Sequence, residues 1–497
     1  MLAEPMMPDD DCYLALKAKD ARFDGNFFTA VISTGIYCRP VCRVKTPKRE
    51  NCRFYRYAAQ ADSAGFRPCL RCRPELAPHS VVWSIQDSSY ILAHQAARLL
   101  DEPELGSDAP SVKKLAARLG VSARHVHRIF EAEFGVSPIQ YLQTRRLLTA
   151  KQLLADTLLP VAQIALMSGF SSVRRFNAAF AVHYKLNPTQ LRRAGPQTTS
   201  NDPGITIRLG YRPPYNVQAM LGFIGKRGIS TIESIADCSQ EYWARRTFCI
   251  EVAGKKHAGW LHMRFDEARS QLVVTVSDSL QGVLPLVINR VRAAFDLDAD
   301  PQAINAVLHD DFPAGDGLRV PGALDGFELG IRAILGQQIT VAAARTLAQR
   351  LVNQYGEPIT TPWPELTRLF PSSAVLATTS ADRLGQLGIV KQRQLAIIGL
   401  AKAVNGGLQL NGGTDVNATV QALKALPGIG DWTAQYIAMR ALRWPDAFPA
   451  GDVALHKALG MQGLKSPVRL AEAASLAWKP WRSYAVIRTW SGAWRGV

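Results

Sequence analysis

The chain has 497 residues and is 47% hydrophobic, which is enough for three or four domains with their own cores. No run of 18 or more apolar residues occurs, so we expect no membrane partner. The formal net charge of +17 favours a polyanionic partner, because each Lys or Arg that neutralises a phosphate releases counterions. The N-terminus, MLAEPMMPDDDC, lacks the basic and then apolar order of a secretory signal, so we expect a cytoplasmic protein.

Two pairs of cysteines in residues 1–78 have the spacing of a zinc site. Cys38 and Cys42 are separated by three residues, and Cys69 and Cys72 by two. Each pair can span one edge of a tetrahedron, while the long connection between the pairs closes the fold. The sequence therefore predicts a small domain with one Zn²⁺ bound by four cysteines. Bound thiolates can still act as nucleophiles, and alkylation of one thiolate would make the cluster less negative and strengthen its attraction to DNA.

The segments TGIYCRPVCR (34–43) and FYRYAAQADSAGFRPCLRC (54–72) resemble the N-terminal domain of the Ada family. The resemblance implies that Cys38 irreversibly accepts a methyl group from a DNA phosphotriester, and that the methylated form activates transcription of repair genes. Spacing alone leaves open that Cys38 is only a zinc ligand. Three residues in the matching segments are candidates for phosphate contacts or are ordinary exposed or capping residues: Thr34, Arg43 and Arg67. The Pro-Cys-His-Arg motif of the family's second methyltransferase is absent, so we expect no O6-methylguanine repair.

Residues 85–195 contain two similar helical segments. LAARLGVSARHVHRIF (115–130) aligns with IALMSGFSSVRRFNAAF (164–180), which pairs Gly120 with Gly169 and Ser122 with Ser171. Each copy predicts a helix, a glycine turn, a serine cap and a second helix, which is the helix-turn-helix pattern. The region resembles the AraC type. The resemblance implies binding of promoter DNA, with RNA polymerase as a further candidate partner.

A turn-rich linker, GPQTTSNDPG, separates this region from segments that alternate between strand and helix patterns. ITIRLGY and QLVVTVSD predict strands and YNVQAMLGFIGKRG predicts a helix, so we expect an α+β subdomain over residues 205–300. Residues 301–497 have helical patterns interrupted by Pro and Gly. The predicted fold class is thus a multidomain, mainly α protein with α+β parts.

LPGIGDWTAQYIAMRAL (426–442) predicts a helix end, a hairpin and a new helix capped by Asp431. Backbone N–H groups at Gly428 and Gly430 could approach a phosphate closely because no Cβ intervenes, although a plain interhelical turn has the same pattern. Asp452 lies about twenty residues beyond the hairpin, at a loop-to-helix junction. An aspartate there is either a simple N-cap or a carboxylate that stabilises positive charge on a sugar during glycosidic cleavage.

Residues from about 205 to 494 resemble the AlkA-type 3-methyladenine DNA glycosylases of the helix-hairpin-helix superfamily, through FELGIRAILGQQITVAAA, LPGIGDWTAQY and WKPWRSYAVIRTW. The resemblance implies that Asp452 is the catalytic carboxylate and that an aromatic pocket holds the extruded base, with members Trp432, Tyr436 and Trp490. Electron-rich rings suit a base that is cationic because it is alkylated, such as 3-methyladenine or 7-methylguanine.

Further details follow from the same resemblance. Gln338 takes the place of the side chain that fills the vacated DNA stack, although the family often has an apolar residue there. Val453 replaces an aromatic residue, which predicts a roomier pocket. Relatives that also cut the strand have a Lys where this chain has Trp432, so we expect a monofunctional enzyme without a Schiff base. The resemblance also implies a monovalent cation at the hairpin carbonyls of Lys424, Leu426 and Ile429.

The leading hypothesis is a sensor and repair enzyme acting on double-stranded DNA, with domains at 1–78 (zinc), 85–195 (helix-turn-helix), 205–300 (α+β) and 301–497 (glycosylase). The alternative is a transcription regulator whose C-terminal half has lost catalysis and only scans DNA.

Overall fold

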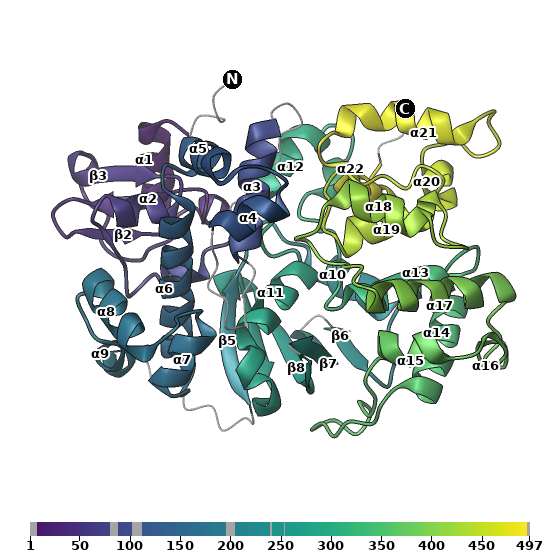
Figure 1. Cartoon of the computed structure of the whole chain (residues 1–497). Coiled ribbons are helices and arrows are strands. Elements are labelled where there is room, and N and C mark those ends of the chain that lie inside the picture. The colour runs from purple at the N-terminus through teal and green to yellow at the C-terminus, as the bar shows by residue number, and fades with distance from the viewer. Residues whose placement is uncertain are drawn as a thin grey trace.

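The structure is a computed structural model that describes residues 7–79, 88–101, 112–194, 204–238, 241–252 and 254–494. Figure 1 shows the N-terminal elements and helices α5–α9 on the left and helices α13–α22 on the right. The larger sheet lies between these two groups, in the lower half of the view. The predicted multidomain, mainly helical class is confirmed.

Residues 7–79, called the N-terminal module below, form a small sheet of order β3-β1-β2-β4. Its elements are α1 (Asp9–Ala18), β1 (Phe28–Val31), β2 (Ile36–Cys38), β3 (Cys52–Tyr55), α2 (Ala58–Ser63) and β4 (Arg67–Pro68). β2 is parallel to β4, and Tyr37 lies opposite Pro68. Cys38 and Cys69 each follow one of these paired residues, so the sheet register brings the two cysteine pairs together.

Residues 88–101 and 112–194 are helical. The helices are α3 (Ser88–Asp101), α4 (Val112–Arg118), α5 (Ala123–Phe134), α6 (Pro138–Asp156), α7 (Val161–Met167), α8 (Val173–Tyr184) and α9 (Pro188–Ala194). Ser122 caps α5 by accepting from the His125 amide at 3.2 Å, as predicted. The second copy differs: Ser172, not Ser171, caps α8, because its hydroxyl is the one that accepts from the Arg175 amide.

The two helix-turn-helix units pack into different cores. The first unit buries Phe130 and Phe134 in a cluster that also contains Tyr57 of the N-terminal module. The second unit buries Phe176 in a cluster that is continuous with Ile207 of the larger sheet. Each fully buried large side chain contributes roughly 1.5–3 kcal/mol. Helix α6, which joins the two units, therefore bridges the N-terminal module and the C-terminal half.

The α+β subdomain is a five-stranded antiparallel sheet of order β5-β9-β8-β7-β6. Its elements are β5 (Ile205–Gly210), α10 (Val217–Gly225), β6 (Glu233–Cys238), β7 (Glu241–Val252), β8 (Lys255–Asp266), β9 (Gln271–Val276) and α11 (Leu284–Ala294). Alternate residues of β9 are buried, which matches the period-2 pattern that predicted this strand.

The C-terminal helices surround a large apolar core that includes Ile334, Leu400 and Ile437. They are α12 (Pro301–Leu308), α13 (Gly326–Leu335), α14 (Val341–Tyr355), α15 (Ser373–Thr378), α16 (Ala381–Gly385), α17 (Lys391–Asn405), α18 (Val416–Lys424), α19 (Asp431–Arg440), α20 (Val453–Ala458), α21 (Pro467–Ala474) and α22 (Arg482–Trp490). The expected cap of α19 was wrong by one residue. Gly430 is the N-cap, and the Asp431 carboxylate instead binds Lys424 Nζ at 2.9 Å.

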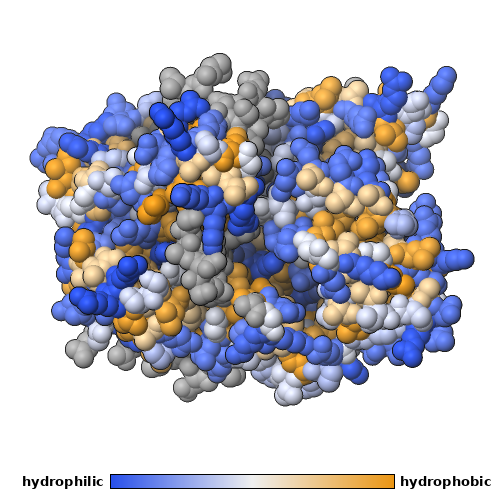
Figure 2. Space-filling model, viewed as in Figure 1, coloured by the Kyte–Doolittle hydropathy of each residue, from blue (hydrophilic) through white to orange (hydrophobic). Residues whose placement is uncertain are grey.

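Within the described residues, no helix combines the length and apolar character needed to cross a bilayer. Hydrophilic residues cover most of the face drawn in Figure 2, and the hydrophobic residues on it form separate patches.

Candidate functional site

Four cysteine sulfurs come together at one end of the N-terminal module. The sulfurs of Cys38, Cys42, Cys69 and Cys72 all lie within 4.8 Å of one another. Zn–S bonds of about 2.3 Å in a tetrahedron place sulfurs roughly 4 Å apart, so the four residues fit one Zn²⁺. The backbone amide of Arg39 also donates to Cys72 Sγ at 3.3 Å, which stabilises a thiolate at that position.

Buried cationic side chains bind the backbone around the cluster. Arg39 is 7% exposed, pairs with Asp24 and donates to the Cys72 carbonyl at 3.1 Å. Lys151, from helix α6, is 2% exposed and donates to the Cys69 carbonyl at 2.9 Å. Each cation also has a carboxylate partner, Asp24 for Arg39 and Glu75 for Lys151 (2.6 Å), so these pairs add no net charge beside the cluster. Lys151 connects the cluster to the helix-turn-helix region.

The three predicted phosphate-contacting residues lie close to the cysteines in the chain. Thr34 is exposed in the β1–β2 turn, where its hydroxyl donates to the Val31 carbonyl at 3.3 Å. Arg43 is exposed and directly follows a cysteine ligand, while Arg67 is half-buried in β4. Their contacts with phosphate stay a prediction.

A cavity of about 770 Å³ lies between the C-terminal helices and the five-stranded sheet. Asp452 lies on its wall and is 9% exposed. Its Oδ1 accepts from the Leu455 amide at 2.8 Å and thereby caps α20. The indole of Trp432 donates to Oδ2 at 2.8 Å, and the indole of Trp490 donates to Oδ1 at 3.1 Å. Three N–H donors thus fix the orientation of one carboxylate.

The predicted aromatic residues line this cavity together. Trp432 and Tyr436 stack with ring centroids 5.2 Å apart and an interplanar angle of 17°. Tyr436 and Trp490 have centroids 6.2 Å apart. Burial alone would raise the pKa of Tyr436, but Arg440 and Arg227 hold it below its ordinary value. The stacked rings form a wall of the size and chemistry that a flat, cationic base requires.

Neither arginine was predicted from the sequence. Arg440 donates to the Tyr436 hydroxyl, to the Pro321 carbonyl at 2.6 Å and to the Gly322 carbonyl at 3.2 Å. Arg440 lies four residues after Tyr436 on the same helix, and this spacing could have predicted their contact. Arg227 follows α10 in a different subdomain, and no spacing in the sequence connects it to the pocket.

A second wall of the cavity, made of ion pairs, was also not predicted from the sequence. Two buried carboxylates, Glu233 and Glu328, alternate with the guanidinium groups of Arg246 and Arg332. Arg332 lies 2.7 Å from an oxygen of each carboxylate. Two positive and two negative charges leave this group of four neutral overall, and its ion pairs join the sheet to α13.

The hairpin glycines have different surroundings. Gly428 has φ +81°, and a Cβ there would lie 3.0 Å from the Gln392 carbonyl oxygen, so this glycine permits close packing on α17. A Cβ at Gly430 would meet no heavy atom of the described chain within 4 Å, so a side chain there would point into open space. Gln337 donates to the Gly428 carbonyl at 2.9 Å, and the next residue, Gln338, is exposed with φ +54°. The predicted wedge therefore projects beside the hairpin.

The predicted cation ligands lie in the same turn. The Leu426 carbonyl accepts from the Ile429 amide at 3.1 Å, and Lys424 ends helix α18. A monovalent cation at these carbonyls stays a prediction.

Four family models match successive parts of the chain. The metal-binding domain of Ada matches residues 11–75, and a helix-turn-helix domain matches residues 115–194. The AlkA N-terminal domain matches residues 206–325, and the HhH-GPD superfamily of base excision DNA repair proteins matches residues 331–483. The Ada model includes all four clustered cysteines, so the cluster is one zinc site, as its spacing predicted.

One relative matches almost end to end. The probable bifunctional transcriptional activator/DNA repair enzyme AlkA of Mycobacterium tuberculosis is 36% identical over 491 residues, which cover 97% of this chain and 95% of the relative. The chain belongs to this family of bifunctional activator and repair proteins. Its halves also match separate members. DNA-3-methyladenine glycosylase 2 of Escherichia coli is 36% identical over 57% of this chain and 95% of its own length. The Escherichia coli activator/repair enzyme Ada is 37% identical over 30% of this chain and 39% of its own length.

Proposed function

We propose that the C-terminal half excises alkylated bases of the 3-methyladenine and 7-methylguanine type from double-stranded DNA, by hydrolysis of the N-glycosidic bond. The observation that carries this proposal is the carboxylate of Asp452, which the indoles of Trp432 and Trp490 hold on the wall of an aromatic cavity. This arrangement combines a base-binding surface with a charge that can act on the adjoining sugar.

The chemistry follows from charge. When the bond between the sugar and the alkylated base breaks, its electron pair goes to the base, which leaves neutral, while positive charge develops on the sugar. Asp452 stabilises that charge and accepts a proton from the water whose oxygen bonds to the sugar carbon. Because the indole and amide donors hold the carboxylate in place before reaction, little reorganisation is required in the transition state. The position of a strand-cutting lysine is occupied by Trp432, so water is the nucleophile and the enzyme is monofunctional.

In the N-terminal module we propose methyl transfer to Cys38. The sulfur attacks the methyl carbon of a phosphotriester, the carbon–oxygen bond breaks with its electron pair going to the phosphate oxygen, and a neutral thioether remains. When bound, zinc keeps its cysteine ligands deprotonated at neutral pH. Thr34, Arg43 and Arg67 are proposed to orient the phosphate.

The remaining assignments are also proposals. The helix-turn-helix region binds promoter DNA in response to methylation of Cys38, with RNA polymerase as the partner and the cytoplasm as the location. Gln338 fills the vacated stack while the hairpin glycines hold a phosphate. The four parts are divided at residues 1–78, 85–195, 205–300 and 301–497.

Release of 3-methyladenine from alkylated DNA by wild type and by Asp452→Asn tests the glycosylase. The amide oxygen of Asn can still accept from the Leu455 amide, so α20 keeps its cap. We expect release to fall by roughly 10²- to 10⁴-fold. Asp415→Asn is the matched control, because Asp415 caps α18 in the same way, at 2.9 Å from the Ala418 amide, outside the cavity lining. Equal release by wild type and Asp452→Asn would contradict the proposal.

A further inference from the structure

Arg212, which follows strand β5, uses every N–H of its guanidinium group to join two parts of the molecule. Its side chain is completely buried. Its five hydrogen bonds run from Nε to the carbonyl of Asp24 (2.7 Å), from Nη1 to those of Asp298 (2.8 Å) and Ala299 (3.2 Å), and from Nη2 to those of Pro78 (3.2 Å) and His79 (3.0 Å). A guanidinium has five N–H donors in a fixed plane, so Arg212 is fully satisfied and no other side chain could replace it.

Three of these carbonyls belong to the N-terminal module, those of Asp24, Pro78 and His79. The carboxylate of Asp24 binds Arg39, the residue after Cys38. Pro78 and His79 lie shortly after Cys72 in the chain. The module thus docks through residues that are linked to the zinc ligands by the Asp24–Arg39 pair and by the short segment after Cys72.

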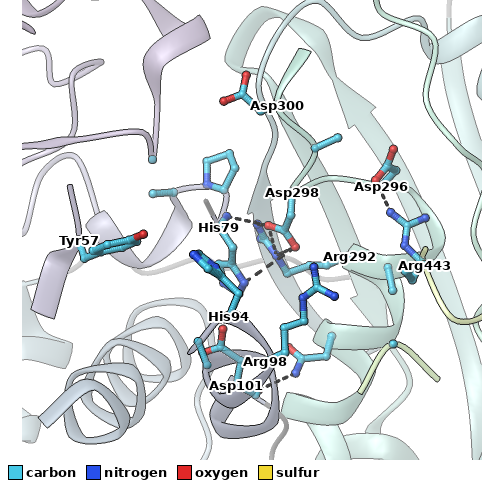
Figure 3. A pocket seen from close by; sticks show the side chains of 18 of the residues that line it. Tyr57, His79, His94, Arg98, Asp101, Arg292, Asp296, Asp298, Asp300 and Arg443 are labelled. Atoms are coloured by element: carbon cyan, nitrogen blue, oxygen red, sulfur yellow. Dashed lines mark hydrogen bonds and ion pairs between the residues drawn. The ribbon is translucent and has the colours of Figure 1, made fainter. Parts of the chain in front are cut away.

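The other two carbonyls belong to residues 296–300, called the acidic loop below. Asp298 accepts from the backbone amide of His79 at 2.8 Å and from Arg292 at 3.1 Å. Figure 3 shows Asp298 between His79 and Arg292, with Asp296 facing Arg443 nearby. Asn26 also donates to the acidic loop, at the carboxylate of Asp300 (3.0 Å). The acidic loop is therefore the surface on which the N-terminal module rests.

The acidic loop also binds the two helices that carry the base pocket. Asp296 is 2% exposed and accepts from Arg443 and, at 2.9 Å, from the Tyr484 hydroxyl. Arg443 lies three residues after α19, the helix of Trp432 and Tyr436. Tyr484 lies on α22, which ends at Trp490. One short loop is thus in direct contact with the docked module on one side and with the supports of the pocket on the other.

We propose that docking of the N-terminal module through Arg212 positions the base pocket, with the acidic loop as the positioning element. When the module is docked, Asp298 and the loop carbonyls are held, Asp296 is fixed, and α19 and α22 keep the geometry in which both indoles bind Asp452. This inference rests on the proposed glycosylase activity, which serves as its readout. A cavity of about 310 Å³ lies at the junction and is lined by residues of all four parts. It gives the acidic loop room to move when the module is released.

Gly25→Ala tests the docking from the module side, far in the chain from the pocket. Gly25 has φ +78°, and a Cβ there would lie 2.1 Å from the Pro78 carbonyl oxygen, so the docking surface of the module must shift. Gly65→Ala is the matched control. Gly65 lies in the same module with φ +89°, but a Cβ there finds no heavy atom within 4 Å among the described residues. Both variants carry similar backbone strain, and only Gly25→Ala disturbs the interface.

Arg212→Lys and Arg212→Met test the docking from the other side. Lysine keeps the charge but offers three donors on one nitrogen, and methionine offers none. In single-turnover excision by the full chain at saturating enzyme, we expect Gly25→Ala and Arg212→Lys each to slow base release about 5-fold or more. Arg212→Met should be slower still, and Gly65→Ala should match wild type. DNA affinity should change less than twofold, because the hairpin at residues 426–430 lies outside the lining of the junction.

The double variant Gly25→Ala/Arg212→Lys should be no slower than the slower single variant, because both changes break the same contact. Wild-type excision rates in Gly25→Ala and Arg212→Lys would overturn the proposal. Equal slowing by Gly65→Ala would overturn it as well, since strain inside the module would then be the cause. Failure of wild type itself to release the base would instead refute the proposed function, so the two failures are distinguishable.

Discussion

The cysteine cluster and the base pocket are built in different ways. All four cluster residues come from two short segments within 35 residues of chain, and paired strands β2 and β4 bring them together. The pocket combines residues from the sheet, α10, α13, α19, α20 and α22 around about 770 Å³. A metal site can be specified by local spacing, whereas a site that accepts a whole base needs walls from separate layers. The following variants test how far the two centres act separately.

The largest expected effect is on methyl uptake. Cys38→Ala should abolish the mass increase of about 14 Da that wild type acquires from methylphosphotriester DNA, because no other sulfur would take its place as nucleophile. Base release should fall by less than about 10-fold, since the pocket lining contains no cluster residue. Intact-protein mass spectrometry measures the first quantity. Cys52→Ala, a buried cysteine outside the cluster, is the control that should keep full uptake.

Trp490→Phe should slow excision about 10-fold or more, because it removes a hydrogen bond to a charged carboxylate while keeping an aromatic ring. Single-turnover base release measures the effect. Trp478→Phe is the matched control, since that indole donates to Asp311 at 2.7 Å outside the cavity lining. It should lower the melting temperature and leave the excision rate within about twofold of wild type. Unchanged excision in Trp490→Phe would show that Asp452 needs no indole donor.

Tyr436→Phe should have a smaller effect, about 3- to 5-fold in excision. The phenol oxygen accepts from Arg440, and without it the guanidinium charge is less well balanced beside a cationic base. The loss should be greater for 3-methyladenine than for a neutral base such as hypoxanthine, which a competition assay on the two substrates measures. An equal loss for both bases would point to stacking rather than charge.

The smallest effect concerns stability of the N-terminal module. Burial raises the pKa of Asp62 to about 7, only partly countered by the hydrogen bond from Thr144 at 2.7 Å. The unfolded pKa is about 3.9, so the folded state binds more protons between these values and loses stability as pH rises from about 4 to about 7. Asp62→Asn removes this loss. Its melting temperature relative to wild type should therefore be higher at pH 8 than at pH 5 in calorimetry, and a pH-independent difference would contradict the assignment.

Much of the fold could be predicted from local patterns. Cysteine spacing, the repeated Gly and Ser positions of the two helix-turn-helix units, and the Pro-Gly turn before α19 each depend on residues that are near in sequence. The errors were also local, by one residue each. Ser172 caps α8 in place of its neighbour Ser171, and α19 begins after Gly430 without a side-chain cap.

The residues that sequence analysis missed act over long separations. Arg212 binds carbonyls 188 and 86 residues away. Every residue has a backbone carbonyl, so the sequence does not show which carbonyl an arginine will bind. Arg246 and Glu328 are 82 residues apart and come from the sheet and α13. A buried arginine is unusual, but its sequence position alone does not show that it is buried.

The most direct test measures both activities on the same full-length preparations of wild type, Cys38→Ala and Asp452→Asn. One assay follows release of 3-methyladenine and the other follows methyl uptake from phosphotriester DNA. The two-centre account predicts that Asp452→Asn loses base release by at least about 100-fold and keeps wild-type methyl uptake. Cys38→Ala should lose methyl uptake and keep base release within about 10-fold of wild type. Wild-type base release by Asp452→Asn, or loss of both activities in that variant, would contradict it.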